Sequence, residues 1–448
     1  MERRYCLGSG LLGLLLFSGQ ALADLPVRHT FSLNNGLQVV VSEDRRAPVV
    51  TTHMLVKVGS SHEYPGQSGL SHALEHMLFR GSSKTAPGEF SQIIERLGGS
   101  QNAYTTRDMT VYHQTLPSDR LAVALELNAD LLQGATLDAA EFEREIEAVK
   151  SERREEVDGY PTDRTREQLQ SIAYTSSYST PVIGWQNDLE RMSNEELKAW
   201  YQTWYAPNNV TLVVVGDVQL DEVKAQVEHY FAGFSRQHLP VTKRPLQSIP
   251  AGPRTMTVLD KSSTPLLNMA FNVPTYATAE QADDVEALRL IQALLGAGMG
   301  ARLSTRLHRQ QAILSSPRVK YKAISRGDTL FEITALVNIA QPRPLPEIQK
   351  AIWAELNNLK QTPPEPQELE RAKALLLAEK VFAQDHLEGQ AASISALLGS
   401  DLAISQLDAD AARLAQITPE KIQQVAASYF TRERFAAAYF QAEEAEDE

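Results

Sequence analysis

The sequence predicts an α+β protein made of two similar domains in tandem. Residues 192–215 and 417–440 repeat one pattern at a constant offset of 225 residues: a capped helix, an aromatic pair, a turn and a strand. Between the two copies, residues 236–254 hold four prolines and few large apolar side chains, which is typical of a linker. We therefore expect an N-terminal domain over 24–235 and a C-terminal domain over 255–441.

The N-terminus predicts export. A charged start is followed by an apolar run at 7–17, which matches the core of a signal peptide and is too short to span a bilayer. Small residues at 21–23 then give a cleavage site, so we expect residues 1–23 to be a signal peptide. This predicts a periplasmic protein, with secretion as the alternative. The single cysteine, Cys6, falls in this segment, so the mature chain would have no thiol nucleophile.

Charge and hydropathy exclude some classes of partner. The formal net charge of −13 disfavours binding to nucleic acid or to anionic lipid. No stretch after the N-terminal segment is apolar enough to cross a membrane. The acidic end at 442–448 is expected to be a solvated tail.

Short apolar runs rich in β-branched residues predict strands in both halves. They lie at 38–41, 49–58, 211–215 and 266–271.

A short apolar helix near 70–79 carries the first chemical signal. His72 and His76 are four residues apart, so both imidazoles project from one face and can reach a single metal ion. Glu75 projects to the same side. Two imidazoles suit zinc, and a nearby carboxylate suits the base that activates water, so the pattern H-x-x-E-H predicts a zinc hydrolase site.

A catalytic zinc ion normally has three protein ligands, so a third is needed. The acidic helix that begins at Asp138 and ends before Gly159 is the best source of a carboxylate. Glu145 and Glu152 on it are seven residues apart and share a face. The residues by themselves leave the choice among the glutamates of this helix open.

In these motifs the chain resembles the pitrilysin family of inverzincins, close to its mitochondrial processing peptidase-like branch. In that family a glutamate ligand follows the motif by about 75 residues, and an acidic residue precedes it by seven. The resemblance therefore implies that Glu152 is the third zinc ligand and that Glu145 supports the ligands from behind. It also implies that each domain is a mostly antiparallel sheet packed with helices, and that the chain forms half of a peptide-enclosing chamber.

The family also has a Gly-Gly-x-x-Asn-Ala-x-Thr segment, which this chain carries at 98–105. The resemblance implies an edge strand in which Asn102 and Ala103 bind extended substrate by strand pairing.

The second half departs from the family. Many relatives place Arg and Tyr seven residues apart there, to hold the substrate carbonyl, whereas this chain has His308 and Ser315 at those positions. Some family members divide the work between a zinc-bearing subunit and a zinc-less partner with the Arg–Tyr pair. The resemblance thus implies that this chain is the zinc-bearing subunit of a heterodimer.

The function expected from these observations is that of an exported zinc endopeptidase. Zinc-activated water would attack a peptide held in extended form, and Glu75 would act as general base. The alternative is a non-catalytic peptide-binding or assembly subunit that keeps the fold. The complete set of motif residues favours the enzyme.

Overall fold

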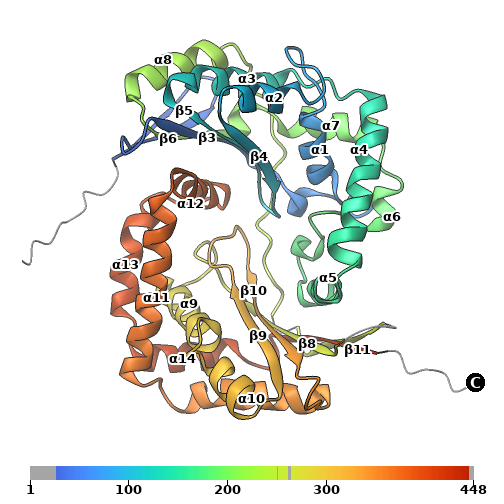
Figure 1. Ribbon diagram of the computed structural model, residues 1–448, viewed down its shortest axis with the longest axis vertical. Coiled ribbons are helices and arrows are strands. Elements are labelled where there is room, and N and C mark those ends of the chain that lie inside the picture. The colour runs from blue at the N-terminus through green and yellow to red at the C-terminus, as the bar shows by residue number, and fades with distance from the viewer. Residues whose placement is uncertain (1–26, 250, 261–263, 443–448) are drawn as a thin grey trace, which may run out of the picture.

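Two mixed β-sheets, each packed with helices, form the two halves of the molecule (Figure 1). The computed structural model describes residues 27–249, 251–260 and 264–442. The expected signal peptide and nearly all of the acidic tail lie outside these residues. Among the helices in these ranges, none combines the length and the apolar character needed to cross a bilayer.

The first sheet has the strand order β1-β2-β6-β3-β5-β4, and only the β2–β6 pair is parallel. The strands predicted at 38–41, 49–58 and 211–215 correspond to β2, β3 and β6. The strands of this sheet are β1 (Arg28–Ser32), β2 (Gln38–Glu43), β3 (Val49–Val56), β4 (Ser100–Thr105), β5 (Thr110–Pro117) and β6 (Val210–Gly216). The helices of the same half are α1 (Leu70–Leu78), α2 (Glu89–Arg96), α3 (Leu121–Gln133), α4 (Ala139–Glu152), α5 (Pro161–Ala173), α6 (Gln186–Leu189), α7 (Asn194–Trp204) and α8 (Leu220–Phe231).

The second sheet has the order β7-β11-β8-β10-β9, with β7–β11 as its parallel pair. The strand predicted at 266–271 is β8. Its strands are β7 (Arg254–Asp260), β8 (Leu266–Val273), β9 (Leu314–Tyr321), β10 (Thr329–Val337) and β11 (Phe435–Ala442). The helices of this half are α9 (Ala282–Gly296), α10 (Leu345–Gln361), α11 (Pro366–Asp385), α12 (Leu387–Gly399), α13 (Gln406–Gln416) and α14 (Pro419–Tyr429).

The sequence repeat corresponds to a structural repeat. Ser193 caps the start of α7 and Thr418 caps the start of α14, and each side chain accepts a hydrogen bond from a backbone N–H of the first turn. Helix α7 leads to β6, which pairs in parallel with β2. Helix α14 leads in the same way to β11, which pairs in parallel with β7. The same supersecondary unit therefore completes both sheets.

Each half also sends one helix to cover the sheet of the other half. Helix α5 of the first half packs on β8 and β11, where Leu169 meets Ala270 and Ala436. Helix α12 of the second half packs under β3 and β6, where Ile394 meets Val213 (Figure 1). The face of each sheet opposite its main core is therefore buried partly by a helix from the other half.

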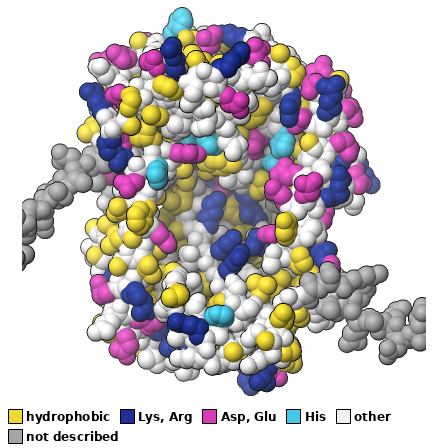
Figure 2. Space-filling model, viewed as in Figure 1, with side chains coloured by type: hydrophobic (Ala, Val, Ile, Leu, Met, Phe, Trp, Pro, Cys, Tyr) yellow, Lys and Arg dark blue, Asp and Glu magenta, His cyan; other side chains and the backbone are white. Residues whose placement is uncertain are grey.

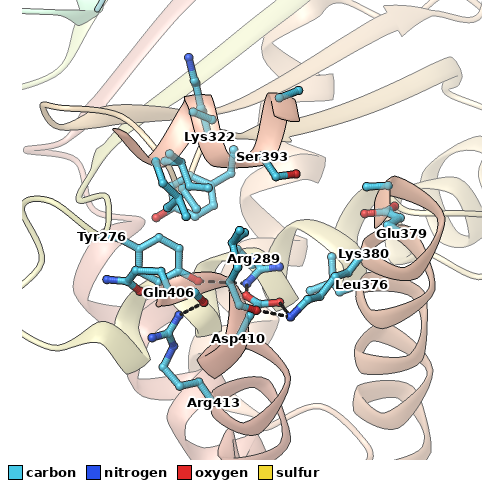
Figure 3. Close-up of a pocket in the computed structure, with 18 of the residues that line it drawn as sticks. Tyr276, Arg289, Lys322, Leu376, Glu379, Lys380, Ser393, Gln406, Asp410 and Arg413 are labelled. Carbon is cyan, nitrogen blue, oxygen red and sulfur yellow. Dashed lines mark hydrogen bonds and ion pairs between the residues drawn. The ribbon is translucent and has the colours of Figure 1, made fainter. Parts of the chain in front are cut away.

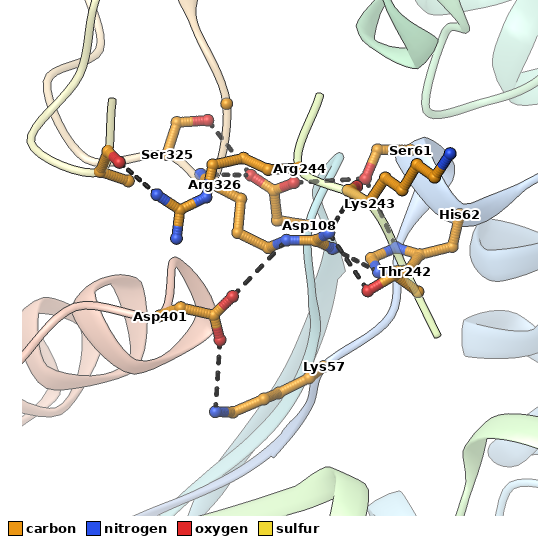
Figure 4. A network of polar contacts seen from close by, with 12 residues as sticks. Lys57, Ser61, His62, Asp108, Thr242, Lys243, Arg244, Ser325, Arg326 and Asp401 are labelled. Atoms are coloured by element: carbon orange, nitrogen blue, oxygen red, sulfur yellow. Dashed lines mark hydrogen bonds and ion pairs between the residues drawn. The ribbon is translucent and has the colours of Figure 1, made fainter. Parts of the chain in front are cut away.

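A buried polar junction joins loops of both halves (Figure 4). The Asp108 carboxylate accepts hydrogen bonds from the Tyr178 hydroxyl at 2.5 Å and, across the boundary, from Ser325 Oγ at 3.1 Å. The guanidinium of Arg326 donates to His62 Nε2 at 2.5 Å and lies 3.7 Å from Asp401. These contacts fix the second half below the loop that follows β4.

Candidate metal centre

Helix α1 presents one apolar face and one polar face. Leu74, Met77 and Leu78 are buried in the core of the first half. His72 and His76 project from the other side, with ring centroids 4.8 Å apart. The helical spacing therefore brings both imidazoles to one place, as the sequence predicts.

The start of α1 is fixed by two features. Gly69 adopts a left-handed conformation with φ of 89°, and a Cβ at this position would lie 2.8 Å from the Ile183 carbonyl oxygen. The buried Glu63 carboxylate accepts hydrogen bonds from the backbone N–H groups of Gly69 and Ser71, both at 2.8 Å. Burial raises the pKa of Glu63 to about 7, against the effect of these two donors. Sequence reasoning missed Glu63, because no local motif links it to the helix.

Helix α4 presents the carboxylates. Its first turn is capped by Asp138, as expected, but the regular α-helix ends at Glu152 and continues as a π-helical turn over Arg153–Asp158. The Arg153 guanidinium there donates to both carboxylate oxygens of the buried Glu167, at 2.9 and 2.8 Å. This two-point ion pair anchors the end of α4 to α5 directly beside Glu152.

His72, His76 and Glu152 form a group that could hold a metal ion. One ligand atom from each lies within 4.8 Å of the other two. A Glu152 oxygen is 3.6 Å from His72 Nε2, and the other is 3.3 Å from His76 Nε2. Ligands bound at about 2.0–2.1 Å in a tetrahedral zinc site lie roughly 3.3 Å apart, so the residues present fit zinc.

Glu145 orients His76. A Glu145 oxygen lies 3.4 Å from His76 Nδ1, and the other is 2.7 Å from Arg80 Nε. A proton held on Nδ1 leaves Nε2 free to bind a metal. Arg80 lies four residues after His76 and two residues beyond the end of α1, and sequence reasoning did not consider it.

The two imidazoles have opposite pKa shifts. Burial and the neighbouring His76 lower the pKa of His72 to about 4, so His72 is neutral. Burial also lowers the pKa of His76, but hydrogen bonds to Glu145 and Glu152 outweigh it and raise the value to about 9. The hydrogen bond between His76 and Glu152 in turn lowers the pKa of Glu152. The two carboxylates therefore favour the protonated form of His76, whereas His72 stays neutral.

Glu75 is buried beside the histidines and lines the same cavity as they do. Its side chain is 9% exposed, and Oε2 accepts a hydrogen bond from Thr105 Oγ at 2.6 Å. Burial raises the pKa of Glu75, although the Thr105 hydrogen bond opposes this. It is not in the group of possible metal ligands. Its environment suits a carboxylate that exchanges a proton.

Asn102 and Ala103 lie on β4, the edge strand of the first sheet. The Asn102 side chain accepts a hydrogen bond from the Ala103 N–H at 2.9 Å, so this N–H points to the open edge. A cavity of about 720 Å³, here called the metal-site cavity, contains both residues together with the histidines. Its other lining residues include Glu75, Thr105, Arg107, Glu152, Asp163, Arg166 and Gln170.

His308 and Ser315 do not line this cavity. His308 is exposed, and its Nδ1 lies 2.7 Å from the Leu314 carbonyl oxygen. Ser315, at the start of β9, is also exposed. Neither residue contacts the candidate metal ligands.

Comparisons with known proteins identify the family. A family model described as Insulinase (Peptidase family M16) matches residues 38–184, and one described as Peptidase M16 inactive domain matches residues 191–376. The chain is 30% identical over 385 residues to zinc protease PqqE of Helicobacter pylori, covering 83% of this chain and 84% of that protein. The chain belongs to the M16 family of zinc peptidases. This confirms the predicted kinship and the predicted enzyme class, a zinc metallopeptidase with a candidate His–His–Glu site.

Other similarities of this M16 peptidase are consistent with that result. It is 30% identical over 215 residues to the mitochondrial-processing peptidase subunit beta of Bos taurus, covering 48% of this chain and 44% of that protein. The crystal structure of a protease from Helicobacter pylori superposes with a TM-score of 0.87 at 26% identity, covering 93% of this chain and all of that one. The periplasmic protease PqqL from Escherichia coli shares the fold, with a TM-score of 0.76 at 19% identity over 92% of this chain and 47% of that one.

Proposed function

We propose that this M16 peptidase is a zinc-dependent endopeptidase that cleaves peptides bound in extended form. His72, His76 and Glu152 are the zinc ligands, and Glu75 is the general base. The observation that carries the proposal is the convergence of these three ligands, from two helices, in a cavity that also contains a buried carboxylate outside the ligand set.

A zinc ion held by these ligands would polarise the scissile carbonyl and acidify a water molecule. Glu75 accepts the proton of the attacking water and delivers it to the leaving amine. Thr105 holds the Glu75 carboxylate in place through its 2.6 Å hydrogen bond. Glu145 keeps the proton of His76 on Nδ1, so that Nε2 remains a ligand.

The substrate pairs with the open edge of β4. An extended peptide there offers a carbonyl oxygen as acceptor for the Ala103 N–H. In the free protein this N–H donates to the Asn102 side chain instead. The Asn102 side chain must therefore turn away when substrate binds. In doing so it becomes available to hydrogen-bond the peptide itself.

The protein is the zinc-bearing subunit of a periplasmic heterodimer, or of a secreted one. The exposed His308 and the short Ser315 support this, because neither can replace an Arg–Tyr pair as donors to a developing oxyanion. A zinc-less homologue carrying that pair should raise the rate until the two chains are equimolar. A homodimer that is fully active alone would refute the division of labour and leave the zinc site untouched.

The test of the proposal separates metal binding from chemistry. Glu152→Gln should lose most bound zinc, whereas Glu75→Gln should keep zinc and peptide affinity and lose about 10²–10⁴-fold in rate. Elemental analysis and cleavage of a quenched fluorescent peptide measure the two properties. A Glu75→Gln variant that cleaves at the wild-type rate would show that another group is the base.

A further inference from the structure

Three cations form a row at the end of strand β9. Arg318 and Lys320 lie two residues apart in the strand and therefore project from one face of it, about 6.5–7 Å apart. Lys322 follows two residues later, directly after Tyr321, the last residue of the strand. All three are exposed. In the part of the chain that the structure describes, none of them has a carboxylate within ion-pair distance. We call these residues the basic row.

The basic row differs from the cations of a nearby cavity in the second half. In a cavity of about 600 Å³ between α9, α11 and α13, Arg289 and Lys380 reach Asp410 (Figure 3). Arg413, which also lines this cavity, lies 3.0 Å from Glu286. Those cations are neutralised by partners within the fold. Lys322 borders the same cavity, but its side chain points away from the ion pairs (Figure 3).

The alternation along β9 decides which side the row faces. Val319 packs against Gly296 of α9, inside the core of the second half. Its neighbours in the row must therefore face the opposite side of the sheet. On that side Lys320 lies across from Glu332 of β10.

Glu332 connects this face to the metal-site cavity. It accepts a hydrogen bond from Gln170 of α5 at 2.8 Å, and Gln170 accepts one from Arg107 at 2.7 Å. Gln170 and Arg107 both line the metal-site cavity. Desolvation in the hollow between the two halves lowers the pKa of Lys322, which the nearby Asp108 raises and Arg107 lowers. Figure 2 shows Lys and Arg side chains inside the hollow between the two halves.

We propose that the basic row is a docking site for acidic residues of the peptide substrate, distal to the bond that is cleaved. The spacing supports this, because alternate side chains of an extended peptide are also about 6.5–7 Å apart. Charge supports it as well: the chain has a net charge of −13, yet these three cations have no partner of their own. Peptides with Asp or Glu at every second position match the row one to one.

The inference rests on the proposed peptidase function for its substrate, so binding is measured apart from cleavage. The full mature chain carrying Glu75→Gln is titrated into two fluorescein-labelled peptides. Both have a neutral Ala-Phe-Leu-Ala core, and the arm is Asp-Ser-Asp-Ser-Asp in one and Asn-Ser-Asn-Ser-Asn in the other. The acidic peptide and the neutral peptide are each made in two forms, one with the arm before the core and one with the arm after it.

For one placement of the arm, we expect the acidic peptide to bind roughly five- to thirtyfold more tightly by anisotropy at low salt, and the advantage to shrink as salt is added. Replacing Arg318, Lys320 and Lys322 together by Gln should abolish the difference. The control replaces three exposed cations outside the row, Arg96, Arg343 and Lys350, by Gln and should keep it. Circular dichroism and zinc content verify that both triple variants fold.

Equal binding of the two peptides, or an advantage that survives the triple substitution in the row, would overturn the inference. Tighter binding of a thymidine oligonucleotide than of the acidic peptide would overturn the choice of partner. The active enzyme distinguishes the two proposals. If it cleaves both peptides with equal KM, the proposed peptidase function is supported and the docking site is refuted. If acidic peptides bind selectively but no peptide is cleaved, the docking site is supported and the peptidase function is refuted.

Discussion

The carboxylates around α1 are the same chemical group in three different settings. Glu152 has its pKa lowered by a hydrogen bond with His76, which favours the anionic form that a metal needs. Burial by itself would raise the pKa of Glu145. The contacts with His76 and Arg80 outweigh this effect and lower the pKa, so Glu145 also stays anionic. Burial raises the pKa of Glu75, which suits the proton acceptor that we propose it to be. Neighbours, rather than residue type, thus separate the three roles.

The role of Glu145 can be tested without touching a ligand. Glu145→Gln should lower zinc affinity about 10–100-fold, because His76 loses the anion that fixes its Nδ1 proton. Competition with a fluorescent zinc chelator measures this change. Glu147→Gln, on the solvent side of the same helix, is the control and should bind zinc as the wild type does. If both variants bind zinc with equal affinity, Glu145 does not support the metal ligands and serves only as an ion-pair partner of Arg80.

At the scale of elements, α1 and α4 must hold their register for the ligands to meet. The end of α4 is anchored by the Arg153–Glu167 pair, and the start of α1 by the Glu63 carboxylate. The first α1 turn is buried, so water does not readily replace this acceptor. The position of both histidines along the helix axis therefore depends on Glu63.

Removing this acceptor should destabilise the protein and loosen the site. Glu63→Ala leaves the N–H groups of Gly69 and Ser71 unpaired in a buried place, which costs about 1–3 kcal/mol of unfolding free energy. Urea denaturation should record the loss, and zinc affinity should fall with it. Glu89→Ala, which removes a more exposed acceptor at the start of α2, should have a smaller effect on stability and none on zinc. A stable Glu63→Ala variant with normal zinc affinity would contradict this account.

At the scale of the whole molecule, the exchange of α5 and α12 makes each sheet depend on the other half. His53 of β3 packs against α12 and is 1% exposed, with Nδ1 3.0 Å from Ser395 Oγ. Burial lowers the pKa of His53 to about 3, and burial with the Arg326 charge lowers that of His62 to about 4. Both neutral imidazoles lie where the halves meet, so acid acts directly on their association.

The direction of the pH effect follows from linkage. Below pH 6.5 the unfolded chain protonates His53 whereas the folded protein does not, so stability falls as pH decreases from 6.5 towards 3. His53→Asn should reduce the loss between pH 6.5 and 5 by about 1–2 kcal/mol. Urea titrations at the two pH values measure it, with the exposed His229→Asn as control. An unchanged pH dependence in His53→Asn would show that this residue is not coupled to folding.

The sequence by itself determined the features that depend on local spacing. His72, Glu75 and His76 lie within two helical turns, and their geometry follows from the helix period alone. The tandem repeat and strands such as 38–41 and 211–215 were predictable for the same reason, because apolar patterning and caps act over a few residues. The choice of Glu152 among the glutamates of its helix came from the family resemblance, since composition does not distinguish them.

Only the tertiary structure decided what depends on contacts between distant segments. Glu63 reaches the start of α1 through a loop, Arg153 meets Glu167 across a helix junction, and α5 and α12 cross to the opposite sheets. The basic row became visible only once β9 was seen at the edge of the second sheet, with its exposed face towards α5. Such contacts depend on how the sheets stack and the loops close, which no spacing within one segment encodes.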